Sequence, residues 1–283
     1  MNTTLICASE LAKRIDDPAV VIVDCRHDLM NPAAGHDGYA VGHIRNAVFA
    51  EMETALSGAR FGADGQFRGR HPLPERAAFI ETLRSWGVDD DTQVVAYDAN
   101  GGMFAARLWW MLRWVGHPAA AVLDGGLAAW QSLALPMTAA LPARPRGTIA
   151  ERAPLVRAVS AAEVLANIDT GERIVIDARA PDRFRGENET IDPVGGHIPG
   201  AKNRFFKDNL QADGRFKDAA QLKADFAPLV GEAARAVMQC GSGVTACHNL
   251  LALEVAGMPG AALYPGSWSE WCADPARPVA VGV

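Results

Sequence analysis

The amino-acid sequence contains an internal repeat as long as a whole domain. An apolar run that ends in Asp-x-Arg occurs at 20–26 and again at 174–179. Further landmarks follow in the same order in both halves: a Gly-His-Ile motif (42–44 and 196–198), a second apolar run (94–98 and 236–240), and a third run with a glycine turn before a tryptophan (122–130 and 262–271). Chance similarity would not keep this order, so the chain is predicted to hold two copies of one domain.

Short apolar strands alternate with helical patterns in each half, for example at 75–86, 103–115, 219–229 and 245–256. This alternation predicts an α/β fold in which each domain has a mainly parallel sheet flanked by helices. The segment after Leu141 is rich in proline and arginine and has no sustained period, which is typical of a linker. We therefore expect an N-terminal domain at 1–140, a linker at 141–157 and a C-terminal domain at 158–283.

The composition excludes several classes of protein. A net charge of −6 without any run of like charge argues against a nucleic-acid or membrane-surface binder. No apolar stretch approaches the roughly 18 residues of a membrane span, and residues 1–5 lack a secretory signal pattern. The five cysteines are scattered and form no C-x-x-C pair, so neither a disulfide framework nor a zinc site is indicated. We expect a protein of the reducing cytoplasm.

Cys240 follows the second apolar run of the C-terminal half and precedes a loop with two glycines and a predicted helix that begins near Thr245. In parallel sheets, ligands bind at the carboxyl ends of the strands. Backbone N–H groups and a helix N-terminus can converge on the sulfur there, which lowers a thiol pKa and favours a nucleophilic thiolate. The alternative interpretation is a core cysteine. The Thr245 hydroxyl is expected to cap the first helical turn.

Several motifs together resemble a two-domain rhodanese-type sulfurtransferase. They are the tandem copies, Gly-His-Ile-Pro-Gly-Ala at 196–201, Cys-Gly-Ser-Gly-Val-Thr at 240–245 and Tyr-Pro-Gly-Ser-Trp-Ser-Glu-Trp at 264–271. The loop is more similar to the 3-mercaptopyruvate branch than to the thiosulfate branch. The resemblance implies two tandem rhodanese-like domains, no cofactor and no metal. It also implies a catalytically silent N-terminal copy, since Asp98 stands where the second half has Cys240 and a carboxylate cannot carry a sulfane sulfur.

The reaction implied by the resemblance is transfer of a sulfane sulfur from 3-mercaptopyruvate through a Cys240 persulfide. The acceptor would be a thiol, such as thioredoxin or a low-molecular-weight thiol, or cyanide. The predicted persulfide loop is Gly241, Ser242, Gly243, Val244 and Thr245. The alternatives are a thiosulfate:cyanide sulfurtransferase (rhodanese) and a non-catalytic sulfur-carrier or binding module. A cysteine phosphatase is excluded because its C-x5-R motif would need arginine at Ala246.

The resemblance also implies that Arg185 binds the donor carboxylate, because arginine pairs with carboxylates through two hydrogen bonds. Relatives in the mercaptopyruvate branch have a second arginine in the insert before the Gly-His-Ile-Pro-Gly motif. Here the insert at 187–195 has three carboxylates and no arginine. Arg183 or an N-terminal residue would have to take its place, or the donor differs. The neutral loop residues Gly241 and Ser242 favour a singly charged donor over the thiosulfate dianion.

His71 resembles a histidine of the silent domain that acts with Ser242 in proton handling in mercaptopyruvate enzymes. The alternative interpretation of His71 is an ordinary loop histidine before a proline. Cys247 and Cys272 are interpreted as core or surface thiols rather than as redox partners of Cys240. The resemblance therefore implies that Cys240, Ser242 and His71 carry the catalysis.

Overall fold

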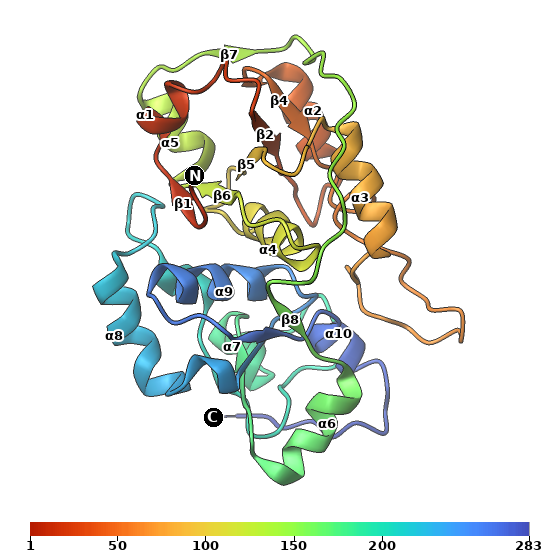
Figure 1. Cartoon of the computed structure of the whole chain (residues 1–283). Helices are drawn as coiled ribbons and strands as arrows, with labels where there is room; N and C mark the ends of the chain where they lie inside the picture. The colour runs from red at the N-terminus through yellow and green to blue at the C-terminus, as the bar shows by residue number, and fades with distance from the viewer. Residues whose placement is uncertain (283) are drawn as a thin grey trace. The chain divides into compact units, whose positions relative to one another are not determined.

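The computed structural model describes residues 1–282, which form two compact units. Unit 1 comprises Met1–Ser57, Pro74–Leu155 and Gln211–Phe216. Unit 2 comprises Gly58–Leu73, Val156–Leu210 and the chain from Lys217 onward. The loop Gly58–Leu73 thus groups with the unit built mainly from the C-terminal half, although its sequence position falls within 1–140. Figure 1 follows the chain by colour from one end to the other.

Unit 1 contains a five-stranded parallel sheet with the strand order β1-β6-β5-β2-β4. Its strands are β1 (Leu5–Ile6), β2 (Val20–Asp24), β4 (Ala47–Phe49), β5 (Gln93–Tyr97) and β6 (Ala120–Leu123). The two central strands β2 and β5 are buried along their whole length, as expected of strands that helices cover on both faces. A small antiparallel pair, β3 (His43–Ile44) with β7 (Met137–Thr138), lies outside this sheet.

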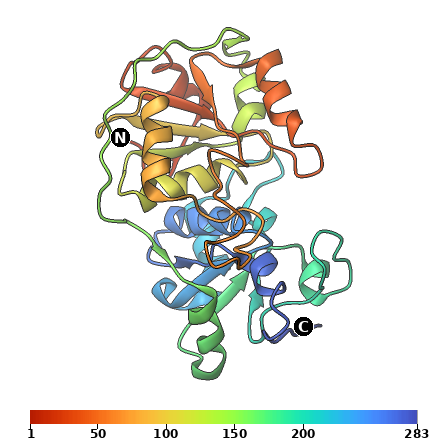
Figure 2. The same cartoon turned by 90° about the vertical axis from the view of Figure 1, so that its right-hand side faces the viewer.

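Helices cover both faces of the unit 1 sheet. They are α1 (Ala8–Ala12), α2 (Ala33–Val41), α3 (Arg76–Ser85), α4 (Ala105–Trp114) and α5 (Gly126–Ser132). The core on one face joins side chains of α1 and α5 to inward residues of the strands, including the fully buried Trp130. Helix α4, yellow in Figure 2, packs on β5 and β6 and buries eight consecutive residues from Ala105 to Leu112.

Unit 2 has a second five-stranded parallel sheet with the order β10-β9-β11-β12-β8. Its strands are β8 (Arg157–Ala158), β9 (Ile174–Asp177), β10 (Lys202–Asn203), β11 (Ala236–Gln239) and β12 (Ala262–Leu263). Read by position along the chain, this order is the same as that of unit 1. The predicted duplication and the α/β class with mainly parallel sheets are therefore confirmed.

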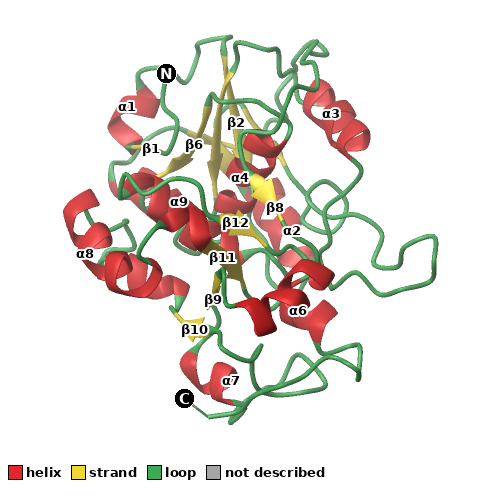
Figure 3. Cartoon of the chain, turned by 60° about the horizontal axis from the view of Figure 1, so that its bottom comes forward, coloured by secondary structure: helices red, strands yellow, loops and turns green. Residues whose placement is uncertain are grey.

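The helices of unit 2 are α6 (Ala161–Thr170), α7 (Pro181–Arg185), α8 (Ala219–Val230), α9 (Thr245–Val255) and α10 (Ser267–Trp271), with 3-10 turns η1 (Phe206–Asn209) and η2 (Ala233–Arg235). Helix α9 packs on β11 and β12, and α8 packs on α9. A core cluster that includes residues of α6 and α10 contains Trp268 and Trp271, which are fully buried. Figure 3 marks β9, β11 and β12 at the centre of this unit.

The lengths and polarity of the helices bear on whether the chain can cross a membrane. In the described residues, 1–282, every helix is too short or too polar to cross a lipid bilayer.

Candidate active site

Cys240 lies directly after β11, at the carboxyl end of a central strand of the unit 2 sheet. The loop that follows leads into α9, which begins at Thr245. The Gly243 N–H donates a hydrogen bond to Cys240 Sγ at 3.2 Å. Cys240 is only 2% exposed. The strand therefore delivers the sulfur into a largely desolvated position where a backbone donor already faces it, and such a donor favours a thiolate or persulfide anion.

The first turn of α10 holds the start of this loop in place. Cys240 N–H donates to Ser267 Oγ at 3.1 Å. In the other direction, Trp268 N–H donates to the Cys240 carbonyl and Ser269 N–H donates to the Gly241 carbonyl, both at 2.9 Å. These bonds satisfy the N–H and carbonyl groups of Cys240 and the carbonyl of Gly241. The backbone that carries the sulfur is thus held by protein groups alone.

Gly243 is required at its position for two reasons. Its φ is +77°, and a β-carbon there would lie 2.2 Å from the Pro265 carbonyl oxygen. The expected capping role of Thr245 is wrong, because Thr245 is the first helical residue and Val244 occupies the N-cap without a side-chain hydrogen bond. The helix begins at Thr245 as expected, but the loop before it is held by backbone contacts rather than by a capping hydroxyl.

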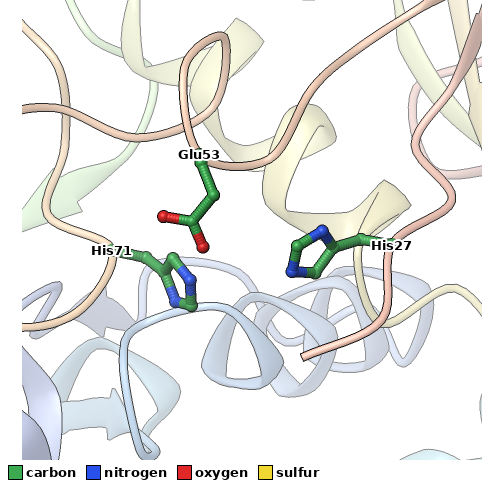
Figure 4. A group of neighbouring side chains, drawn as sticks. All are labelled: His27, Glu53 and His71. Carbon is green, nitrogen blue, oxygen red and sulfur yellow. The ribbon is translucent and has the colours of Figure 1, made fainter. Parts of the chain in front are cut away.

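His71 and Ser242, both in unit 2, are brought into contact. His71 Nδ1 lies 2.8 Å from Ser242 Oγ, and the two residues are 2% and 6% exposed. Figure 4 shows the His71 ring projecting from its loop. A hydroxyl can donate to one partner and accept from another, so Ser242 can pass a proton between the imidazole and a group bound above the loop.

Two guanidinium groups of unit 2 lie over Gly241. A β-carbon built on Gly241 would be 2.7 Å from Arg70 Nη2 and 3.7 Å from Arg183 Nη2. The Asp192 carboxylate bridges the two arginines: Oδ1 accepts from Arg70 Nη1, and Oδ2 accepts from Arg183 Nη2 at 3.3 Å. Burial raises the pKa of Asp192, and the charge of Arg70 opposes that rise. Asp192 thereby fixes both cations on the same side of the cysteine loop.

Glu189 is the second buried carboxylate of this group. It accepts from Arg183 at 2.8 and 3.0 Å and from Arg179 at 3.3 Å. Burial acts to raise the pKa of Glu189, but hydrogen bonds from Arg183 and from nearby backbone amides lower it below its usual value. The cations over Gly241 are thus partly balanced by carboxylates of the insert, and the group as a whole carries little excess charge.

The structure places Arg185 elsewhere. Its guanidinium makes two hydrogen bonds to Glu187, at 2.8 and 2.6 Å, and its side chain is 33% exposed. Arg183, two residues earlier on α7, is the arginine that approaches the loop. The sequence pointed to Arg183 or an N-terminal residue in place of the missing arginine, but it did not single out Arg70 or its partner Asp192. The available signal was an insert with three carboxylates and no basic residue of its own, which has to find its cations elsewhere in the chain.

The corresponding position in unit 1 is occupied by Asp98. Its carboxylate is fully buried and accepts four backbone hydrogen bonds, from the amides of 100, 102, 104 and 105 at 2.8–2.9 Å. Burial raises the pKa of Asp98, while these four amides oppose the shift. The loop after the central strand therefore forms a nest of amides in this copy, and the side chain of Asp98 itself fills that nest.

Unit 1 also holds a histidine next to a carboxylate. Atoms of His27 and Glu53 that could bind a metal lie within 4.8 Å of each other, and their side chains face one another in Figure 4. Burial lowers the pKa of His27, and the charge of Glu53 opposes that change.

All five cysteines are free thiols. Cys247 is fully buried and its thiol donates to the Gly243 carbonyl at 3.4 Å. Cys272 is 9% exposed, and burial raises its pKa to about 11. The raised pKa keeps the Cys272 thiol protonated near neutrality, which does not suit a second nucleophile. The Cys247 thiol contacts the backbone of the cysteine loop.

Known proteins resemble this chain over its full length. The rhodanese-like domain pattern matches residues 8–133 and 160–274. A Pseudomonas aeruginosa protein named "Probable 3-mercaptopyruvate sulfurtransferase" is 45% identical over 285 residues, covering 99% of each chain. The thiosulfate sulfurtransferase of Bos taurus is 38% identical over 207 residues, covering 70% of this chain and 69% of its own.

A solved structure agrees with these sequence matches. The crystal structure of SseA from Escherichia coli, described as a 3-mercaptopyruvate sulfotransferase, superimposes with a TM-score of 0.80 at 33% identity. The match covers 95% of this chain and all of SseA. The duplicated sheet, the cysteine loop at the end of β11 and these matches lead to one conclusion. The chain belongs to the rhodanese family and carries two rhodanese-like domains in tandem.

Proposed function

We propose that this protein is a sulfurtransferase that moves a sulfane sulfur from 3-mercaptopyruvate to a thiol or cyanide through a Cys240 persulfide. The observation that carries the proposal is Cys240 itself, buried at the end of β11 with the Gly243 amide on its sulfur. The relatives named for 3-mercaptopyruvate support the choice of donor. We further propose that the N-terminal half, 1–140, is catalytically silent, because Asp98 occupies the amide nest of its loop.

In the first step, the Cys240 thiolate attacks the sulfur of 3-mercaptopyruvate. The new S–S bond forms as the C–S bond breaks, and the bonding pair leaves on carbon as the enolate of pyruvate. One proton then converts the enolate to pyruvate, and Cys240 holds a persulfide. The hydrogen-bonded pair of His71 and Ser242 is suited to deliver that proton, since it leads from a buried imidazole to the loop.

In the second step, an acceptor takes the outer sulfur. A thiolate such as that of thioredoxin or a low-molecular-weight thiol attacks the outer sulfur, and Cys240 leaves as a thiolate. With cyanide, the same attack gives thiocyanate. The Gly243 amide stabilises the leaving thiolate as it did the attacking one.

For the carboxylate of the donor, we propose Arg183 rather than Arg185. The support is that Arg183 Nη2 lies near Gly241, together with Arg70 Nη2, whereas the Arg185 guanidinium pairs with the exposed side chain of Glu187. The balance of two guanidinium groups by Asp192 and Glu189 favours a singly charged donor over the thiosulfate dianion. Free cysteines throughout the chain fit the reducing cytoplasm, which we propose as its location.

The experiment is intact-protein mass spectrometry after brief exposure to 3-mercaptopyruvate or, separately, to thiosulfate. We expect the wild-type protein to gain one sulfur atom from 3-mercaptopyruvate and to release pyruvate. The Cys240→Ser variant should gain none. Loading by thiosulfate alone would keep the persulfide and replace the donor, making the protein a thiosulfate:cyanide sulfurtransferase. Loading by neither donor would leave a non-catalytic sulfur-carrier or binding module.

A further inference from the structure

We propose that Arg70, held in place by Asp192, is a specificity-determining residue that binds the donor carboxylate together with Arg183. This inference rests on the proposed function and deepens it. The insert at 187–195 has no arginine of its own, and its carboxylate Asp192 instead recruits a cation from a loop 122 residues earlier in the chain. Asp192 is a positioning residue in this arrangement.

The first support is the space that Arg70 occupies. Its Nη2 lies 2.7 Å from the point where a β-carbon on Gly241 would be. Gly241 is the residue directly after the nucleophile, so a side chain there would project beside the reacting sulfur. The glycine leaves that space open, and the guanidinium of Arg70 fills it. The residues of the loop itself are neutral, and the guanidinium donors beside Gly241 come from other segments of the chain, where Asp192 and Glu189 balance their charge.

The second support is the way the Arg70 segment is fixed. Arg70 N–H donates to Ser269 Oγ at 3.1 Å. Gly69 has a φ of +100°, and a β-carbon on it would lie 2.7 Å from the Gly266 carbonyl oxygen. The segment thus lies directly against α10, the same helix whose first turn anchors the cysteine loop. Common anchoring gives the guanidinium a defined position relative to the sulfur.

The third support is the chemistry of the bridged pair. Asp192 uses one oxygen for Arg70 and the other for Arg183, and its side chain is 3% exposed. The Arg70 side chain remains 21% exposed. A guanidinium has five N–H donors in a planar fork. Arg183 also donates from Nε and Nη2 to Glu189, which leaves its Nη1 donors for a ligand, and Arg70 keeps donors after pairing with Asp192. Two such forks on one side of the loop suit a 2-oxo carboxylate, which offers several acceptor oxygens in one plane.

The test compares two sulfur donors on the full-length protein. 3-Mercaptopyruvate carries a carboxylate, whereas inorganic polysulfide does not; with polysulfide the Cys240 thiolate forms the new S–S bond as another S–S bond breaks and a shorter polysulfide leaves. Arg70→Gln should lower kcat/KM for 3-mercaptopyruvate by about 10-fold or more, through KM, because one charge-assisted contact is lost. Loading of Cys240 by polysulfide should stay within about twofold of wild type. Arg70→Lys should recover part of the loss.

Control variants test whether the effect depends on the location of Arg70 and Asp192 or only on the loss of a charge. Arg68→Gln removes an exposed arginine of the same loop that pairs with Asp64, and it should leave both donors unaffected. Asp192→Asn should raise KM for 3-mercaptopyruvate by about fivefold with little change in kcat, because the two forks lose their common anchor. Glu187→Gln, in the same insert, is its control.

Gly241→Ala gives an independent check that does not remove any charge. Its methyl group would displace the Arg70 guanidinium, so it should lower kcat/KM in the wild-type background and have a much smaller effect in the Arg70→Gln background.

If wild-type protein is loaded by 3-mercaptopyruvate but Arg70→Gln is loaded equally well by it, the inference is overturned and the proposed function stands. If Arg70→Gln loses both donors to the same extent, Arg70 serves the fold rather than the carboxylate, and the inference is again overturned. If wild-type protein is loaded by neither donor, the proposed function itself fails.

Discussion

His71 Nδ1 lies 2.8 Å from Ser242 Oγ, and both residues are almost completely buried. The contact joins the loop that precedes α3 to the cysteine loop, and the two residues are 171 positions apart in the chain. A buried imidazole and hydroxyl in contact have few other exchange partners, so a proton leaving or reaching the loop has a short defined path. In the proposed reaction, this contact is the route for the proton that pyruvate formation consumes.

The first prediction follows from this pair. Ser242→Ala and His71→Asn should each slow pyruvate release from 3-mercaptopyruvate by about 10- to 100-fold, because proton delivery to the enolate is impaired. Single-turnover pyruvate release measures this step. The double variant should be little worse than either single one, since both residues serve one relay. Loading from inorganic polysulfide moves no proton to carbon and should be unaffected; an equal loss with both donors would refute the relay.

The second prediction distinguishes the two arginines of α7. Arg183→Gln should raise KM for 3-mercaptopyruvate by about 10-fold, because its guanidinium lies beside Gly241. Arg185→Gln should change KM by less than about twofold, since an exposed ion pair with Glu187 contributes little. Steady-state kinetics with a fixed acceptor measure both. The opposite ranking would restore Arg185, the residue that the family resemblance favours.

The third prediction concerns the reactivity of the thiols. Cys7 is exposed, and a hydrogen bond with Ser9 lowers its pKa, so a larger fraction is thiolate at neutral pH. Burial raises the pKa of Cys272 to about 11 and raises that of Cys25 well above its ordinary value, so both thiols stay protonated near neutral pH.

Iodoacetamide at mildly alkaline pH should therefore label Cys7 well before Cys272 or Cys25, as read by peptide mass spectrometry. Cys7→Ser should remove this early product without changing sulfur loading of Cys240. Labelling of Cys272 at the same rate as Cys7 would show that its surroundings open in solution.

Local patterns in the sequence were sufficient to predict where these helices lie. The helix expected at 245–256 is α9 at Thr245–Val255, and the helix expected at 75–86 is α3 at Arg76–Ser85. Apolar periodicity and glycine stops act within a few residues, so they can be read from a single sequence. The expected capping hydroxyl of Thr245 was wrong because Val244 is the N-cap residue and makes no side-chain hydrogen bond. The loop is held by backbone contacts, which the identity of a side chain does not reveal.

Long-range pairings could not be predicted in the same way. Asp192 meets Arg70 across 122 residues, and no period or motif links the two positions. The grouping of Gly58–Leu73 with unit 2 has the same origin, because its contacts are made with α10 and the insert rather than with its neighbours in sequence. The choice between Arg183 and Arg185 stays a prediction, because two arginines at this spacing are equivalent in a motif and differ in the carboxylate that each one contacts.

The last prediction tests the amide nest of the silent copy. Asp98→Ala should lower the free energy of unfolding by about 3 kcal/mol or more, because four buried N–H groups lose their acceptor. Asp98→Asn should lower the free energy of unfolding by less than Asp98→Ala does, since its amide oxygen still accepts hydrogen bonds from some of the four N–H groups. Its NH2 group cannot accept, so part of the loss remains. Urea unfolding followed by linear extrapolation measures both.

The pH dependence of the Asp98 contribution has a definite sign. Burial raises the pKa of Asp98 above its value in the unfolded chain, so the folded state binds this proton more tightly. The stability that Asp98 contributes is therefore complete below the unfolded pKa and declines as pH rises through the folded pKa. Because asparagine does not titrate, the stability of wild-type protein relative to Asp98→Asn should decrease from acidic to neutral pH. An increase over that range would mean that the four amides outweigh burial, and that the nest binds a carboxylate in its charged form.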